Sequence, residues 1–526
     1  MEEAKLNQKD SAAKYLVRGG YVFTDATLGE KGVLQNAAVL VEGDRIVAVE
    51  DYETLRTRYP DAKTIGGEDH IVMPGIIDAH DHGRGLSFLQ LGAGYDFLEN
   101  ALMDWPSVAS ISPELNAKMD AWRHLRSGCT TFHHNEGGMV NDKEAYNKFS
   151  TVLKTYRSVG VRAAFSPGIR DINFIAYDDE AFYETLPPNL QSFAKPYIFF
   201  DKDEARTAYF ELFDRLYEEF TDGLTSVFFG PFWAHGSTET YLREVKERSD
   251  SLGGLPIHMH TLQTPHQRAY GYKKYGKSLL KWLDDVGIVD EHFTLGHAVY
   301  LDEEDIDLLA ERRGSVTHHP SCNLSMRNGI APVYFMQKAG VNVALGIDEK
   351  AFADDGDCIA ELRMIYYINR LSGFDLANTP ALTPYEVLAM GTCNAARSLG
   401  LEKEVGKLVP GMKADIITLD TESMLRDPWV SPDLDIGRAF IHRAKGQDVK
   451  NVMVNGAMVI ENSACLTMDI PTLYDEVRRF VEKGQTDSQR AYGEGMRALK
   501  PYMQKWYAKI LPSFPRDPFY MVNSRH

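Results

Sequence analysis

The strongest constraint on the fold is an alternation of short apolar runs and helical segments through the middle of the chain. Segments of helical character, such as Ser112–Arg126, Glu239–Leu252 and Asp302–Glu311, separate most of these runs. Alternation of strand and helix eight times predicts an α/β fold of the (β/α)8 or TIM-barrel type. The eight runs are Gly75–His82, Cys129–Asn135, Val161–Gly168, Thr225–Trp233, Leu255–Thr261, Phe293–Val299, Ser315–Ser321 and Val341–Asp348.

Polar side chains concentrate at the ends of these predicted strands. In a (β/α)8 barrel the carboxyl ends of the strands surround the active site. We therefore expect one mouth that gathers the following residues: His80, His82, His133, His134, His260, His297, His318, His319 and Asp348.

Four of these residues form a candidate metal site. His80 and His82 are two apart, so their side chains project from the same side of one strand. His260 ends the fifth predicted strand and Asp348 ends the eighth, which neighbours the first strand once a barrel closes. Three imidazoles and one carboxylate suit a single divalent ion, zinc or iron(II), with room for a water molecule.

The regions outside the barrel predict further parts. Residues 15–73 and 404–466 contain short strands with turns and are expected to form one small β-sandwich that flanks a barrel of residues 74–403. An insertion at about 170–222 is longer than an ordinary connection, as lids and substrate-binding loops often are. Residues 467–526 predict a helical extension that packs on a neighbour or covers a groove.

The net charge and the distribution of apolar residues exclude several classes of binding partner. The net charge of −18 argues against nucleic acid and anionic membrane surfaces, because neither is attracted to an acidic protein. The first residues lack the basic and apolar regions of a secretory signal, and no apolar run reaches the length of a membrane span. We expect a soluble, cytoplasmic protein with a small-molecule substrate.

Several of these motifs resemble the amidohydrolase superfamily. The stretches "VMPGIIDAHDH", "HMHTLQT", "GHAVYL" and "GKLVPGMKADIITLD" are similar to the subgroup of cytosine, guanine and adenosylhomocysteine deaminases and triazine hydrolases, over roughly Tyr15 to Leu466. The resemblance implies a β-sandwich beside a (β/α)8 barrel, one metal ion and a homo-oligomer. It also implies the ligands His80, His82, His260 and Asp348.

The expected mechanism gives other residues distinct roles. Asp348 would accept a proton from metal-bound water, and His297 would polarise the electrophilic group of the substrate. The acidic segment Glu349–Asp357 predicts a solvated loop. The candidate substrate contacts, each of which also fits a structural role, are His134, His318, Asn323 and Arg84.

Gln263 departs from the pattern of the subgroup, whose deaminases carry His-x-x-Glu in this segment. A carboxamide has no proton to exchange near neutral pH. Three alternatives follow. The first is a substrate with a carbonyl or thiocarbonyl that needs no such acid; the second is another residue, such as His134 or His266, in place of the acid; the third is an inactive metal-binding scaffold.

The sequence thus predicts a metal-dependent hydrolase with catalytic residues Asp348, His297 and Gln263. The expected substrate is a small, ring-containing compound with a non-peptide carbon–nitrogen bond, as in a cyclic amide or urea. Deamination of a heterocycle is the alternative, followed by hydrolytic removal of chloride or thiol from such a ring.

Overall fold

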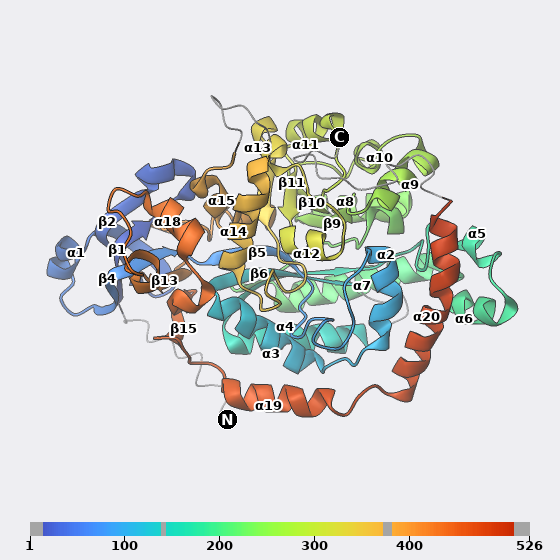
Figure 1. Cartoon of the computed structure of the whole chain (residues 1–526), viewed down its shortest axis with the longest axis horizontal. Helices are drawn as coiled ribbons and strands as arrows, with labels where there is room; N and C mark the ends of the chain where they lie inside the picture. The colour runs from blue at the N-terminus through green and yellow to red at the C-terminus, as the bar shows by residue number, and fades with distance from the viewer. Residues whose placement is uncertain (1–13, 138–143, 372–380, 510–526) are drawn as a thin grey trace.

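The structure is a computed structural model that describes residues 14–137, 144–371 and 381–509. Strands and helices alternate through the central part of the chain, which confirms the predicted α/β class (Figure 1). No helix in the described parts of the chain combines the length and the apolar character that crossing a bilayer requires.

The eight predicted central strands are all present, as two four-stranded parallel sheets. One sheet has the order β5-β6-β7-β8 and the other the order β12-β11-β10-β9. The strands are β5 (Ile76–Asp81), β6 (Cys129–Gly137), β7 (Arg162–Gly168), β8 (Thr225–Val227), β9 (Ile257–Thr261), β10 (Phe293–His297), β11 (Ser315–His318) and β12 (Asn342–Leu345).

Isolated parallel bridges connect the two sheets at both sides. Asp81 pairs with Asp348 on one side, and Phe229 and Trp233 pair with Ile257 and His260 on the other. Strand β8 is therefore shorter than predicted, because the chain beyond Val227 makes single bridges instead of a continuous ladder.

Both ends of the chain contribute to a third, eight-stranded sheet of order β16-β15-β14-β13-β4-β1-β2-β3. Strands β4 and β13 pair antiparallel at the seam between the N-terminal and C-terminal parts, with Pro74 opposite Ile416. Separate apolar clusters lie on the two faces, around Val17 and around Leu16. The strands are β1 (Lys14–Phe23), β2 (Val33–Glu42), β3 (Arg45–Asp51), β4 (Lys63–Pro74), β13 (Ile416–Asp420), β14 (Val449–Val454), β15 (Ala457–Glu461) and β16 (Ala464–Cys465).

The predicted helices begin where side-chain caps are available. Ser112, Thr238 and Asp302 each accept a hydrogen bond from a backbone N–H of the first turn that follows. The helices before the C-terminal extension are α1 (Tyr52–Arg58), α2 (Leu98–Asp104), α3 (Pro113–Arg126), α4 (Ala145–Val159), α5 (Asp179–Tyr183), α6 (Pro188–Ile198), α7 (Lys202–Phe220), α8 (Glu239–Ser251), α9 (Pro265–Tyr275), α10 (Leu279–Val286), α11 (Glu303–Glu311), α12 (Pro320–Ser325), α13 (Val333–Ala339), α14 (Cys358–Ile368), α15 (Pro384–Met390), α16 (Cys393–Ser398), α17 (Glu422–Leu425) and α18 (Ile436–Arg443).

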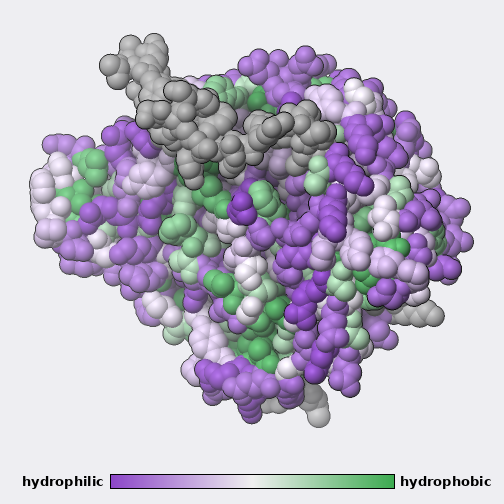
Figure 2. Space-filling model, turned by 45° about the vertical axis from the view of Figure 1, so that its right-hand side comes forward, coloured by the Kyte–Doolittle hydropathy of each residue, from purple (hydrophilic) through white to green (hydrophobic). Residues whose placement is uncertain are grey.

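The C-terminal extension forms two helices that pack on the same chain. Helix α19 (Ile470–Val481) buries Leu473 and Val477 against α3, and α20 (Asp487–Tyr507) runs beside α2 and α6 (Figure 1). The rest of the predicted extension, from residue 510, lies outside the described residues. Figure 2 shows a mostly hydrophilic face on which hydrophobic residues gather in the central part.

Candidate metal centre and active site

Strand ends bring together the four predicted metal ligands. One donor atom from each of His80, His82, His260 and Asp348 lies within 4.8 Å of the others. His80 Nε2 and His82 Nε2 are 3.3 Å and 3.1 Å from Asp348 Oδ1, and His260 Nε2 is 3.3 Å from His82 Nε2. These residues are far apart in the sequence but close in space, because the carboxyl ends of β5, β9 and β12 lie side by side.

Backbone carbonyls orient two of the imidazoles. His82 Nδ1 donates to the carbonyl of Asn135 at 2.8 Å, and His260 Nδ1 donates to the carbonyl of Phe232 at 2.6 Å. A ring nitrogen that donates to a carbonyl carries the proton, so the Nε2 atoms present their lone pairs to the cluster. Both nitrogens of His80 are buried without a hydrogen-bond partner, which is rare for a buried polar group unless it has another ligand.

The pKa shifts of the candidate ligands are also consistent with a bound cation. Burial and neighbouring imidazoles hold the pKa of His80 and His260 well below the usual value, so both rings are neutral at pH 7. Burial alone would raise the pKa of Asp348, but its close contacts with His80 and His82 hold that pKa well below its usual range. Burial lowers the pKa of His82, but Asp348 outweighs this effect and raises it. Three imidazoles with one carboxylate are a donor set that a divalent ion accepts.

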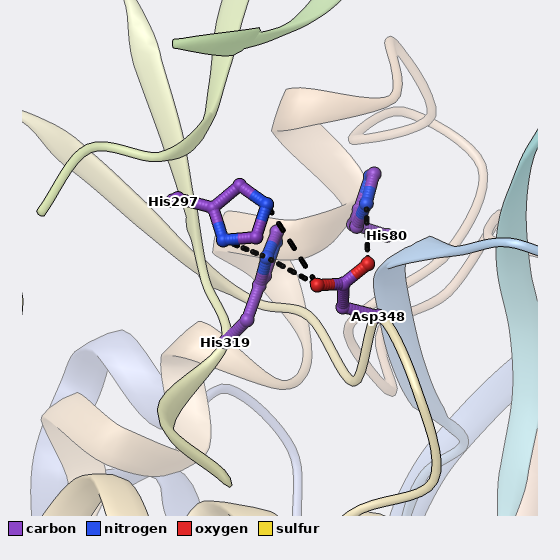
Figure 3. Close-up of side chains that lie close together, drawn as sticks. All are labelled: His80, His297, His319 and Asp348. Atoms are coloured by element: carbon purple, nitrogen blue, oxygen red, sulfur yellow. Dashed lines mark hydrogen bonds and ion pairs between the residues drawn. The ribbon is translucent and has the colours of Figure 1, made fainter. Parts of the chain in front are cut away.

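A second combination of donors overlaps the first. His80, His297, His319 and Asp348 also have donor atoms within 4.8 Å of one another (Figure 3). His297 Nε2 and His319 Nδ1 each lie 3.7 Å from Asp348 Oδ2, on the side of the carboxylate away from His82. Asp348 therefore touches the predicted ligands through one oxygen and the pair His297 and His319 through the other.

His319 was predicted at the mouth, but neither as a metal ligand nor as a substrate contact. Its ring stacks on His80 with centroids 4.4 Å apart, and a Cβ at Gly346 would lie 2.4 Å from His319 Cδ2. The signal was present in the sequence, because Thr317 and His319 are two residues apart and share one face of the strand end. His258 and His319 both contact the Thr317 hydroxyl.

Two residues of the cluster have strained backbones. Asp348 has φ +67° and His297 has φ +74°, in the left-handed region that residues other than glycine rarely adopt. Such conformations cost about 1–3 kcal/mol each and persist where surrounding contacts fix them, often at functional sites.

The cluster opens on a cavity of about 210 Å³. Gln263 lines this cavity, and its Oε1 is buried without a hydrogen-bond partner among the described residues. The aromatic walls include Trp105, Phe174, Phe232 and Trp233, and the charged lining residues besides the metal cluster are Arg84, Arg170 and Glu349.

The prediction of a solvated acidic loop after Asp348 is wrong at its start. Glu349 and Lys350 are only 5% and 2% exposed. Glu349 forms an ion pair with Arg84, and Lys350 Nζ lies 3.2 Å from Asp120 Oδ1. Each buried charge thus has an opposite charge beside it, which composition alone does not reveal.

The predicted substrate contacts lie in different places. Arg84 lines the cavity, whereas His134 points to Tyr156 Oη at 2.9 Å and to Glu136 Oε2 at 3.0 Å. Asn323 Oδ1 accepts a hydrogen bond from His297 Nδ1 at 2.9 Å and so orients that ring.

His318 and His266 also lie away from the described lining residues. His318 is buried, and no group of the described residues forms a hydrogen bond with either of its nitrogens. His266 Nδ1 lies 3.2 Å from Glu99 Oε1, and neither residue is among the described residues that line the cavity. Arg170, which no motif singled out, does line the cavity.

Comparisons with known proteins agree with this geometry. The model of the amidohydrolase family matches residues 71–459, and a model of the imidazolonepropionase-like composite domain of bacteria matches residues 37–62. A 5-methylthioadenosine/S-adenosylhomocysteine deaminase of Caldanaerobacter subterraneus is 29% identical over 86% of this chain and 95% of its own length. A 5'-deoxyadenosine deaminase of Methanosarcina acetivorans is 27% identical over 90% of this chain and 98% of its own.

Solved structures have the same fold. An adenosine deaminase from Xanthomonas campestris with bound zinc superposes with a TM-score of 0.74 at 25% identity, over 90% of this chain and 99% of its own. Atrazine chlorohydrolase from Arthrobacter aurescens, complexed with zinc, has a TM-score of 0.73 at 20% identity, over 89% of this chain and 100% of its own. The chain therefore belongs to the amidohydrolase family and is a hydrolase of that family, as its motifs predicted.

Proposed function

We propose that this hydrolase uses one divalent ion, zinc or iron(II), to hydrolyse a non-peptide carbon–nitrogen bond in a small ring compound. The observation that carries the proposal is the set of donor atoms of His80, His82, His260 and Asp348 within 4.8 Å of one another. The zinc in the Xanthomonas campestris structure supports zinc as the ion. When bound, such an ion would lower the pKa of water toward about 7 and so supply a nucleophile at neutral pH.

The proposal places this site in the mouth of a closed (β/α)8 barrel. The bridges from Asp81 to Asp348 and from Phe229 to Ile257 support closure of the two four-stranded sheets into one barrel of residues 74–403. Residues 15–73 and 404–466 then form the flanking β-unit, with the insertion at about 170–222 and the extension from residue 467 added outside.

Different residues of the cavity accept a proton, orient the His297 ring and exclude water. Asp348 Oδ2 is the oxygen that accepts a proton, since it faces His297 Nε2 and His319 Nδ1 at 3.7 Å and the Cys322 thiol at 2.7 Å. Asn323 holds the His297 ring so that Nε2 faces the reacting group. Aromatic walls exclude water and favour a flat substrate.

Gln263 favours a substrate that already carries a carbonyl, as in a cyclic amide, urea or carbamate. Its amide can orient a substrate by hydrogen bonding, but it cannot deliver a proton to a ring nitrogen. The loss of a general acid typically lowers a rate by about 10²–10⁴-fold. Glu349 lines the same cavity but is held in its ion pair with Arg84.

Deamination of a heterocycle is the second candidate, favoured by the relatives named as deaminases of adenosine derivatives. The two candidates differ in their products. A panel of ureas, lactams, pterins, triazines and adenosine derivatives, assayed for free ammonia and by mass spectrometry for ring opening, separates them. Ammonia released with an intact ring would overturn the first candidate.

The Gln263→Glu variant sharpens this test. If the glutamine selects the substrate, the variant gains deamination of the same panel and retains its melting temperature. Loss of all activity without any gain would argue against this role of Gln263.

Metal content tests the site itself. We expect purified protein to contain about one equivalent of zinc or iron, and His260→Ala to lose most of it. His442→Ala, at an exposed histidine, should retain the metal as a matched control. Equal metal content in both variants would rule out the four-ligand site.

A further inference from the structure

A second, larger chamber adjoins the active-site cavity. Its volume is about 710 Å³, and it shares His82, Arg84, Arg170 and Phe232 with the smaller cavity. One wall comes from α20, through Tyr492 and Met496, beyond residue 459 where the family match ends. The chamber is therefore continuous with the metal cluster, and part of its wall lies outside the residues that the family model matches.

The lining of the second chamber is mainly apolar. Its apolar side chains include Phe88, Leu91, Val108, Ile111, Ile175 and Met496. Binding of an apolar ligand group to such a surface is favourable, in proportion to the apolar area removed from water. The chamber is too large for one small ring already seated at the metal cluster.

Charges in the chamber are balanced except at Arg170. Arg84 is paired with Glu349, and Lys148 Nζ lies 2.8 Å from Glu136 Oε1. Arg170, within the described part of the chain, forms no ion pair. Its Nη1 donates to the carbonyl of Phe174 at 3.1 Å, and no described group accepts a hydrogen bond from Nε or Nη2.

The surroundings of Arg170 hold its guanidinium at the junction of the two cavities. The group stacks between the rings of Phe174 and Trp233, at 4.2 Å and 4.8 Å from their centroids. A Cβ at Gly236 would lie 3.0 Å from Arg170 Cγ, so the absence of a side chain there makes room for the stem. Burial lowers the pKa of Arg170 to about 10, which still leaves it charged at neutral pH.

Asp179 acts on Arg170 through space but does not neutralise it by contact. Its carboxylate accepts hydrogen bonds from the backbone N–H groups of Phe174, Ile175 and Ala176. A planar guanidinium with free donors in a partly dry site is the group that best recognises a carboxylate.

We infer that the substrate carries an apolar substituent with a carboxylate, that the substituent occupies the second chamber, and that Arg170 binds the carboxylate. The inference rests on the proposed function only for the reacting ring. Binding of the substituent itself requires no turnover. Arg170 is thus a specificity-determining residue, distinct from the metal ligands.

The test compares phenylbutanoate with its neutral isostere phenylbutanamide as probes of the metal-loaded full-length protein, by isothermal titration calorimetry. A charge-assisted hydrogen bond in a desolvated site predicts that the acid binds roughly tenfold tighter than the amide. Arg170→Met should abolish this preference. Arg215→Met, the same change at an exposed position outside both cavities, should retain it.

A second variant tests the chamber. Ala109 lines only the larger cavity, so Ala109→Trp should weaken both probes by several-fold while the preference for the acid persists. A preference for the acid that survives Arg170→Met would place the carboxylate elsewhere, for example on the metal, and would overturn the inference. Equal binding of acid and amide to the wild type would also overturn it. Neither result depends on hydrolysis, so failure of the proposed function would be seen separately, in the product assays.

Discussion

At the scale of single residues, the metal cluster depends on a glycine as well as on histidines. His319 stacks on His80 only because position 346 has no side chain: a Cβ there would lie 2.4 Å from His319 Cδ2 and 3.1 Å from His80 Cβ. Contacts of less than 3 Å between carbon atoms force one group to move. The orientation of a candidate metal ligand is therefore set by a residue that has no side chain.

Gly346→Ala should lower metal affinity by about 10–100-fold, the usual effect of disturbing groups that orient ligands. Competition with a chelator measures this change. Gly223→Ala is the matched control, because no atom lies within 4 Å of a Cβ at that position. Unchanged metal affinity in Gly346→Ala would show that the His319 ring moves freely.

Residue type and spacing predicted that the four candidate ligands lie together, because two residues of one strand and two strand ends follow from periodicity alone. They did not predict Arg170 or the burial of Glu349, since each depends on which loop folds over the mouth. The sequence prediction named His318 as a substrate contact, whereas the structure places His319 beside His80 and Asp348, because the sequence alone did not show which face of the strand end was interior.

His124 links stability to pH. Burial lowers its pKa, but the charges of Asp120, Asp78 and Asp81 outweigh this effect and raise it to about 10; Lys350 also lies against Asp120. The folded state therefore keeps a proton that the unfolded chain loses above about 6.5. The stabilisation is full below that pH and is lost as the pH rises toward 10.

The free energy of unfolding should accordingly fall between pH 7 and pH 10 in the wild type, and His124→Gln should have a shallower slope over the same interval. Urea titrations at several pH values give both slopes. Parallel slopes would mean that His124 is already neutral in the folded protein.

At the scale of elements, α20 matters because it closes the larger chamber. Gly493 lies against the short 3-10 turn Trp105–Ser107, where a Cβ would come within 2.7 Å of the carbonyl oxygen of Pro106. Trp506 Nε1 also donates to the carbonyl of Tyr177 at 2.7 Å. The helix is thus fixed at both its N-terminal and C-terminal halves.

Gly493→Ala should push α20 away from that turn, lower the melting temperature by several degrees, and expose the helix to trypsin at Lys500 and Lys505. Glu494→Ala, at the next and exposed position, should behave like the wild type. Equal resistance to trypsin in the two variants would contradict tight packing of α20.

The element order was largely predictable, because strands and helices differ in the period of their apolar residues. The eight central strands follow that pattern, and β8 departs furthest from its predicted bounds, because it ends at Val227 and not at Trp233. The helices of the extension were foreseen as helices. Their contacts with α2 and α3 were not predicted, because the amphipathic pattern of a helix indicates which face is buried but not which element it packs against.

At the scale of the whole molecule, a buried ion pair joins the central strands to the flanking sheet. Arg162, at the start of β7, binds both oxygens of Asp415 at 2.8 Å and 3.0 Å, just before β13. Both residues are only 3% exposed. Removing one partner leaves an unpaired charge in the interior.

Arg162→Met should therefore lower the free energy of unfolding by about 3–5 kcal/mol. The double variant Arg162→Met with Asp415→Leu should recover much of that loss, because no charge remains unpaired. Chemical denaturation measures both. A double variant as unstable as the single one would show that shape, and not charge, dominates this contact.

The seam between β4 and β13 sets an order on synthesis. Residues 75–415 must leave the ribosome before β4 can pair with β13. Their synthesis takes on the order of tens of seconds at about 5–20 residues per second. During that interval the edge of β4 can pair with another nascent chain. Strand β13 therefore protects the edge of β4 from pairing with other chains. A truncated message that lacks β13 would produce a fragment prone to aggregate.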